Sequence, residues 1–92
     1  GNYFCSPEEA VIAHENLDKA MELYKEAIRL KPNSALTYML LGNAHYLKGE
    51  VEQAIASYRA SINISPENDE YRLVYTQVLD EYIDKKRNGE TV

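Results

Sequence analysis

Residues 35–68 read ALTYMLLGNAHYLKGEVEQAIASYRASINISPEN, and this stretch decides the fold. Its apolar residues recur every three or four positions in two runs, which is the period of a helix with one buried face. Gly49 stands between the runs, where the end of a helix needs a residue that accepts a positive φ. Pro66 follows the last apolar residue by two positions and stops the second run. The stretch therefore predicts two helices, over residues 35–48 and 51–64, joined by a tight turn.

A second copy of this pattern lies 34 residues earlier in the chain. The shift of 34 takes Ala20 to Ala54, Tyr24 to Tyr58, Pro32 to Pro66, Leu17 to Val51, Met21 to Ile55, Ala27 to Ser61, Ile28 to Ile62 and Leu30 to Ile64, without a gap. A constant period that keeps small, aromatic and proline positions in register predicts a repeat architecture.

The full copy resembles the tetratricopeptide repeat family, whose pattern requires aromatic, small and proline residues at defined offsets. The residues that carry the resemblance are Tyr38, Leu41, Gly42, Tyr46, Ala54, Tyr58, Ser61 and Pro66, with His45 at the slot just before Tyr46 where the aromatic residue is usual. The resemblance covers residues 35–68 fully and residues 17–34 well. It implies an all-α fold, an α-solenoid of antiparallel helix pairs stacked into a right-handed superhelix.

The front half of the first copy departs from this pattern. Pro7 and Glu8 stand where Leu-Gly is expected, and Glu15 and Asn16 replace the glycine of the turn. A helix can start at Pro7, because Ser6 before it is a good N-cap and proline suits the first helical position. The first helix of this copy therefore starts late.

Two structures are compatible with this irregular first copy. One is a short helix over residues 7–15 with a turn at Asn16, and the other is a single helix over residues 7–31. The weak helix propensity of the junction at residues 14–16 favours the turn. A continuous helix would instead open the hairpin and invite a dimer in which two chains exchange helices.

The last segment, residues 69–88, predicts a final helix. Its apolar stripe consists of Tyr71, Val74, Tyr75, Val78, Leu79, Tyr82 and Ile83, and three basic residues lie at its negative end. A terminal helix with one polar face suits the end of a solenoid. We therefore expect one domain over residues 1–92: an irregular first repeat (1–34), a full repeat (35–68) and a capping helix (69–88).

The charge and composition exclude several classes of protein. The net charge is −5 at pH 7, which argues against a general nucleic-acid surface. Cys5 is the only cysteine and cannot form a disulfide within the chain, which favours a reducing compartment. No apolar run approaches roughly 18 residues, so no membrane span is expected, and the first residues do not read as a signal peptide. Together these features predict a cytoplasmic protein.

Catalytic and metal-binding patterns are not found. His14 and His45 have no second histidine at helical spacing to complete a metal site. Cys5 has no histidine beside it to lower its pKa, and no glycine-rich phosphate loop is present. The sequence therefore predicts a protein without enzymatic activity and without a cofactor.

The family resemblance implies a binding surface, because the first helix of each pair lines a concave groove that holds a peptide. Carried onto this chain, the groove comprises Leu36, Met39, Asn43, Tyr46, Leu47, Leu73 and Gln77, with Glu70, Asp80, Glu9 and Ala13 beside it. Asn43 stands where family members often hydrogen-bond a peptide backbone. The apolar floor and acidic surroundings suit an apolar or basic segment of a partner protein.

One known ligand class of the family is disfavoured. Some members clamp the C-terminal carboxylate of heat-shock chaperones with Lys, Asn and Arg, but here Cys5, Glu9, Leu40, Glu70 and Val74 stand at those positions. Two interpretations of the groove stay open. It binds a partner peptide or helix, or it serves self-association, in a homo-oligomer or by stacking on further repeats of a longer array.

Overall fold

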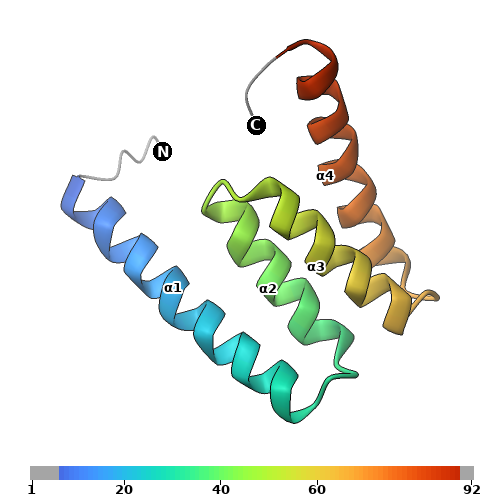
Figure 1. Ribbon diagram of the computed structural model, residues 1–92, viewed down its shortest axis with the longest axis horizontal. Helices are drawn as coiled ribbons and strands as arrows, with labels where there is room; N and C mark the ends of the chain where they lie inside the picture. The colour runs from blue at the N-terminus through green and yellow to red at the C-terminus, as the bar shows by residue number, and fades with distance from the viewer. Residues whose placement is uncertain (1–6, 90–92) are drawn as a thin grey trace.

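A computed structural model describes the backbone of residues 7–89 and the side chains of residues 15–89. Its helices are α1 (Pro7–Leu30), α2 (Ala35–Leu47), α3 (Val51–Ile64) and α4 (Asp69–Arg87), and the described residues form no strand. Consecutive helices run antiparallel, with α2 between α1 and α3 and with α4 against α3 (Figure 1). The predicted all-α solenoid is confirmed.

The ends of the helices follow the local signals in the sequence. The Ser34 hydroxyl caps α2 by accepting a hydrogen bond from the backbone N–H of Thr37 at 3.3 Å. Gly49 has a φ of 83°, as predicted for the residue that ends the α2–α3 hairpin turn. The Asn68 side chain caps α4 by accepting from the N–H of Tyr71 at 3.1 Å. The start of α2, the α2–α3 turn and the start of α4 therefore lie at the capping residues of the sequence.

The α2–α3 pair is held by an unusually close approach of the two helices. A Cβ placed on Gly42 would lie only 2.6 Å from the ring of Tyr58, so no larger residue fits there without movement. Ala54 and Ser61 of α3 are fully buried. The Ser61 hydroxyl donates to the backbone carbonyl of Ala35 at 2.9 Å, which satisfies a polar group that would otherwise be buried without a partner.

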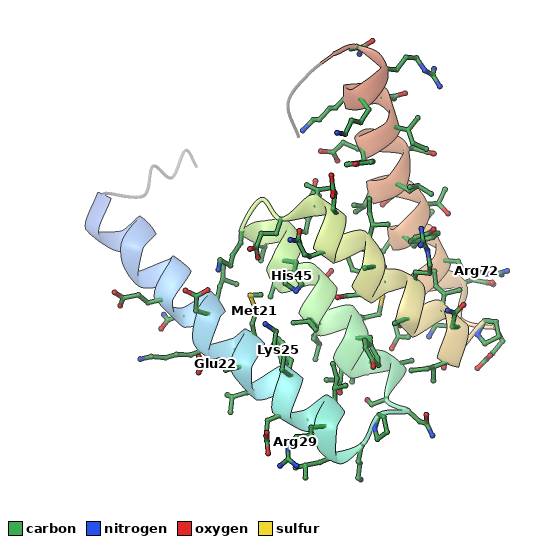
Figure 2. All side chains as sticks on the ribbon, viewed as in Figure 1. Met21, Glu22, Lys25, Arg29, His45 and Arg72 are labelled. Atoms are coloured by element: carbon green, nitrogen blue, oxygen red, sulfur yellow. The ribbon has the colours of Figure 1, made fainter. Side chains whose placement is uncertain are left out.

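The core consists of two clusters, one on each side of α2. The larger unites α2, α3 and α4 and comprises Met39, Ala54, Ile55, Tyr58 and Val78, with the apolar stripe of α4 packed against them. The smaller joins α1 to α2 through Met21, Leu41 and Ala44, with Leu17, Tyr24 and Ile28 around them. Figure 2 shows Met21 directed from α1 toward α2. Of the predicted α4 stripe, Ile83 alone stays outside the cluster and is 41% exposed.

The turn predicted at Asn16 is wrong, because α1 is one helix over Pro7–Leu30. After Pro7 this segment contains no glycine or proline, and residues such as Asn cost a helix only about 0.7 kcal/mol or less each. Packing supplies a second reason. The repeat shift of 34 places Glu8 at the position of Gly42, where even a methyl group is too large. A front helix folded back onto α1 would bring a glutamate to the tightest point of the pair.

The tight crossing gives a direct test of the fold. We expect Ala54→Leu to lower the free energy of unfolding by about 1–3 kcal/mol or more, because the new side chain has no space between α2 and α3. Ala56→Leu is the matched control, since Ala56 lies two residues away on the exposed side of the same helix and should change stability little. Urea unfolding followed by circular dichroism measures both; equal midpoints would contradict this register of the helices.

Candidate functional site

One face of α2 exposes apolar side chains between the sides that α1, α3 and α4 cover. We call Leu36, Leu40, Asn43 and Leu47 the α2 stripe. Their spacing of four, three and four residues places them on one face of the helix. Leu36 is 57% exposed and Leu47 is 67% exposed. This row of accessible leucines on a capped, packed helix is the candidate site.

Two residues of the expected groove have side chains that contact the rest of the domain. Met39 is only 5% exposed and belongs to the core with Tyr58 and Val78, so its side chain is not offered to a partner. Tyr46 is half-buried, and its hydroxyl donates a hydrogen bond to the carboxylate of Glu81 in α4 at 2.9 Å. This hydrogen bond raises the pKa of Tyr46. Both side chains thus join α2 to the rest of the domain.

Asn43 is exposed but already has a partner in the fold. Its side-chain oxygen accepts a hydrogen bond from the Tyr58 hydroxyl at 2.7 Å. Tyr58 is 1% exposed, and burial, with a smaller contribution from the nearby charge of Tyr46, raises its pKa to about 12. The oxygen of Asn43 is therefore held from inside the domain, which orients the amide so that its NH2 group can donate to a ligand.

The remaining expected groove residues lie on α4 or at the start of α1. Leu73 is 58% exposed, and Gln77 is exposed as well. The acidic residues expected beside the groove, Glu70 and Asp80, are exposed on the same helix. The α4 contribution thus combines one leucine with polar and acidic groups. Glu9 and Ala13 lie in the backbone of α1, but their side chains, like all of Cys5, are outside the described part of the structure.

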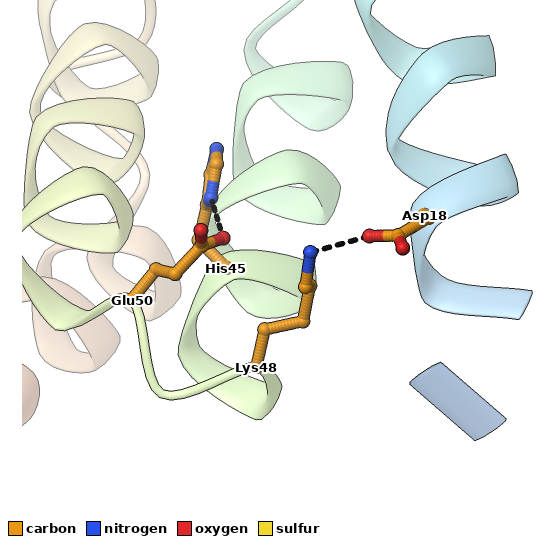
Figure 3. Close-up of polar contacts among 4 residues, drawn as sticks. All are labelled: Asp18, His45, Lys48 and Glu50. Atoms are coloured by element: carbon orange, nitrogen blue, oxygen red, sulfur yellow. Dashed lines mark hydrogen bonds and ion pairs between the residues drawn. The ribbon is translucent and has the colours of Figure 1, made fainter. Parts of the chain in front are cut away.

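Polar contacts around the α2–α3 turn anchor it from both sides (Figure 3). His45 Nδ1 lies 3.0 Å from a carboxylate oxygen of Glu50, and this hydrogen bond lowers the pKa of Glu50. Lys48 forms an ion pair with Asp18, which links the turn to α1. The His45 side chain is only 12% exposed, so this histidine is a structural residue of the turn. The sequence could have indicated the His45–Glu50 contact, because these two residues lie on either side of the turn glycine, Gly49.

Other kinds of site find no support in the described residues. Within them, no three His, Cys, Asp or Glu side chains gather in a way that could hold a metal ion. None of the described helices is both long and apolar enough to cross a membrane.

A comparison with protein families agrees with the geometry of the helix pairs. The family profile described as TPR repeat matches residues 10–49 and 42–73. The two matches overlap and together span most of α1, the α2–α3 pair and the first turn of α4. They therefore cover well over half of the chain.

Curated relatives match a shorter part of the chain. BBSome complex member BBS4 is 36% identical in Mus musculus, over 61% of this chain and 11% of that protein. The Bos taurus BBS4 is 38% identical over the same shares. Human protein O-mannosyl-transferase TMTC1 is 35% identical over 56% of this chain and 6% of its own length. The chain thus spans about a tenth of the two BBS4 proteins and a smaller share of TMTC1.

A double-mutant cycle measures the hydrogen bond that holds Asn43. We expect Asn43→Ala and Tyr58→Phe each to lower the free energy of unfolding by about 1 kcal/mol. Because both remove the same bond, the double variant should lose less than the sum, with a coupling energy of about 0.5–1.5 kcal/mol. Additive losses, measured by urea unfolding, would show that the two side chains do not interact.

The raised pKa of Tyr58 predicts a loss of stability at high pH. The folded protein holds the phenol proton up to about pH 12, whereas the unfolded chain releases it near the ordinary value of 10.0. The stabilising contribution is therefore complete below pH 10.0 and is lost as the pH rises toward 12. Urea midpoints across this range should fall less steeply in Tyr58→Phe than in the wild type, and parallel curves would refute this source of the effect.

Proposed function

The chain belongs to the tetratricopeptide repeat family, whose repeats mediate protein–protein interaction, and from this premise we propose that the α2 stripe binds a segment of a partner protein. The observation that carries the proposal is the exposure of Leu36 and Leu47, at 57% and 67%, on a helix whose other sides are packed. Burying one such leucine contributes about 1.5–3 kcal/mol before the cost of ordering the partner. Two or three buried leucines would together contribute roughly 3–9 kcal/mol before that cost.

The chemistry of the site favours a partner segment that is apolar on one side and basic beside it. Leucines supply the contact area, the Asn43 NH2 group can donate to a backbone carbonyl, and Gln77 can donate or accept. On α4, Glu70 and Asp80 are exposed and share a face with the exposed Leu73 by helical spacing, so they place negative charge beside that leucine. With a net charge of −5 the whole chain also attracts basic segments over longer distances.

The relatives support a role in assembly. BBS4 is by its name a member of a complex, and this chain is similar to a part of it. TMTC1 is by its name a transferase, but the match covers 6% of that protein. We therefore carry no transferase activity over to this chain, and we propose a non-catalytic interaction module. The single cysteine is the reason to expect it in a reducing, cytoplasmic compartment.

Peptides selected from a displayed random library on the wild-type domain test the proposal. We expect the selected peptides to combine leucine-like residues with Lys or Arg, and synthetic versions to bind in fluorescence anisotropy. Leu36→Ser and Leu47→Lys should each weaken binding at least about tenfold, because each removes about 1.4 kcal/mol or more of contact.

Ile83→Lys is the matched control for these variants. Ile83 is 41% exposed on α4, on a different face from Gln77, so its change should leave the peptide affinity as it is. Circular dichroism checks that each variant is folded. Unchanged affinity in Leu36→Ser and Leu47→Lys, or an equal loss in Ile83→Lys, would rule out the α2 stripe as the binding site.

A further inference from the structure

The second half of α1 exposes a face that its counterpart in the full repeat buries. The shift of 34 residues pairs this half with α3. In α3 the side chains of Ala54, Tyr58 and Ser61 are at most 1% exposed, because α2 covers them. Their equivalents Ala20, Tyr24 and Ala27 in α1 are all partly exposed. The first copy therefore has the surface of a helix pair without the covering helix.

Leucines on this face show the contrast most clearly. Leu23 is 70% exposed, whereas its equivalent Ser57 is only 8% exposed. Leu30, in the last turn of α1, is 67% exposed. We call Ala20, Leu23, Tyr24, Ala27 and Leu30 the open α1 face. It lies on a different helix from the α2 stripe.

Residues 7–14, the described part of the segment that would cover this face in a regular repeat, continue straight along α1 instead of folding back onto it. In the full repeat the covering helix α2 directly precedes the turn, and the equivalent segment here ends at residue 14. Because α1 continues straight through the junction, its first half extends past the α2–α3 turn (Figure 1). Residues 7–14 of the same chain therefore do not fold back onto the open α1 face while α1 stays continuous.

We propose that two copies of this chain associate through antiparallel α1 helices, each laying the first half of its α1 on the open α1 face of the other. The arrangement is reciprocal, as a two-fold interface requires. The turn at residues 48–50 has its equivalent at residues 14–16, so the two-fold axis passes close to Asn16. Two separate helices can also adjust their register, which the short turn of a hairpin does not allow. Glu8 is then no longer forced into the tight position that Gly42 occupies.

The sequence of α1 complements itself in this orientation. Its first half contains Ala10, Val11, Ile12 and Ala13, which supply apolar residues to cover the exposed leucines. Glu8, Glu9 and Glu15 give this half a charge of −3. In the second half, counted through Lys31 directly after the last helical residue, four basic residues (Lys19, Lys25, Arg29, Lys31) against three acidic ones (Asp18, Glu22, Glu26) give +1. Antiparallel pairing sets −3 against +1, whereas parallel pairing sets −3 against −3. Charge therefore favours a second copy in the antiparallel orientation.

Sedimentation equilibrium of the full chain, over about 1 µM to 1 mM, tests the association. The mass should rise with concentration from 10.5 kDa toward twice that value. Leu23→Glu should keep the chain at the monomer mass, because this side chain is exposed in one copy and the dimer buries it under the first half of the other α1. Leu73→Glu, at a 58% exposed leucine of α4, is the matched control and should still dimerise.

A wild-type mass of 10.5 kDa at every concentration would overturn the proposal and leave the open α1 face to a different protein. A dimer that survives Leu23→Glu would overturn it as well. Neither result bears on peptide binding at the α2 stripe, which is measured separately with Leu47→Lys. The two proposals can thus fail independently.

Disulfide cross-linking tests the orientation. In a Cys5→Ser background, Asn16→Cys should link two copies through its only thiol, because it lies near the two-fold axis. Ala27→Cys is the control. At about 1.5 Å per residue along α1, the two copies of residue 27 are roughly 30 Å or more apart, so no link should form. A link through Ala27→Cys, or none through Asn16→Cys, would refute the antiparallel arrangement.

Discussion

The structure depends on the contact between Gly42 and the ring of Tyr58. A Cβ on Gly42 would come within 2.6 Å of that ring, so the glycine sets how closely α2 and α3 approach. At this separation Ala54 and Ser61 are completely buried, and the Ser61 hydroxyl reaches the Ala35 carbonyl. Close packing of this kind stabilises through many small dispersion contacts, and a single added methyl group would disrupt it. One residue without a side chain therefore allows the whole helix pair.

The same constraint explains why the two copies of the repeat differ. The first copy retains Ala20, Tyr24 and Ala27 on its second helix but has Glu8 where the glycine is required. Without this close approach, a hairpin in the first copy would lack the packing contacts that stabilise the α2–α3 pair. The junction at residues 14–16 therefore continues as a helix. The result is a domain with one complete helix pair, a long helix on one side of it and a final helix on the other.

On the surface of the α2–α3 pair, some polar side chains are already hydrogen-bonded within the domain, whereas the neighbouring leucines are exposed. The Tyr58 hydroxyl holds the oxygen of Asn43, and the Tyr46 hydroxyl is held by Glu81 on α4. The leucines of the α2 stripe have no such internal contact to make and stay exposed. Two apolar surfaces result, the α2 stripe and the open α1 face, and each is suited to a different occupant. The proposed partner peptide and the proposed second copy follow from that difference.

The sequence by itself determined the features that depend on spacing and local chemistry. The period of 34 residues, Gly49 and Pro66 predicted the α2–α3 pair, and the residues of the α4 stripe predicted its packing. These can be read from the chain because helix periodicity and capping act over a few residues. The family resemblance implied Leu36, Leu47 and Leu73 as groove residues, and all three side chains are exposed.

Only the tertiary structure decided which way individual side chains and junctions turn. Met39 packs in the core, the Tyr46 hydroxyl bonds to Glu81 on α4, and the Asn43 oxygen accepts a hydrogen bond from Tyr58. Each of these contacts is made with a residue of another helix, so the local sequence does not reveal it. The continuity of α1 is another feature that contacts across the domain decide. Helix propensity differs by only tenths of a kcal/mol at residues 14–16, so the packing position of Glu8 outweighs it. Local preference decides where a helix can form, whereas contacts across the domain decide whether it continues and which face remains open.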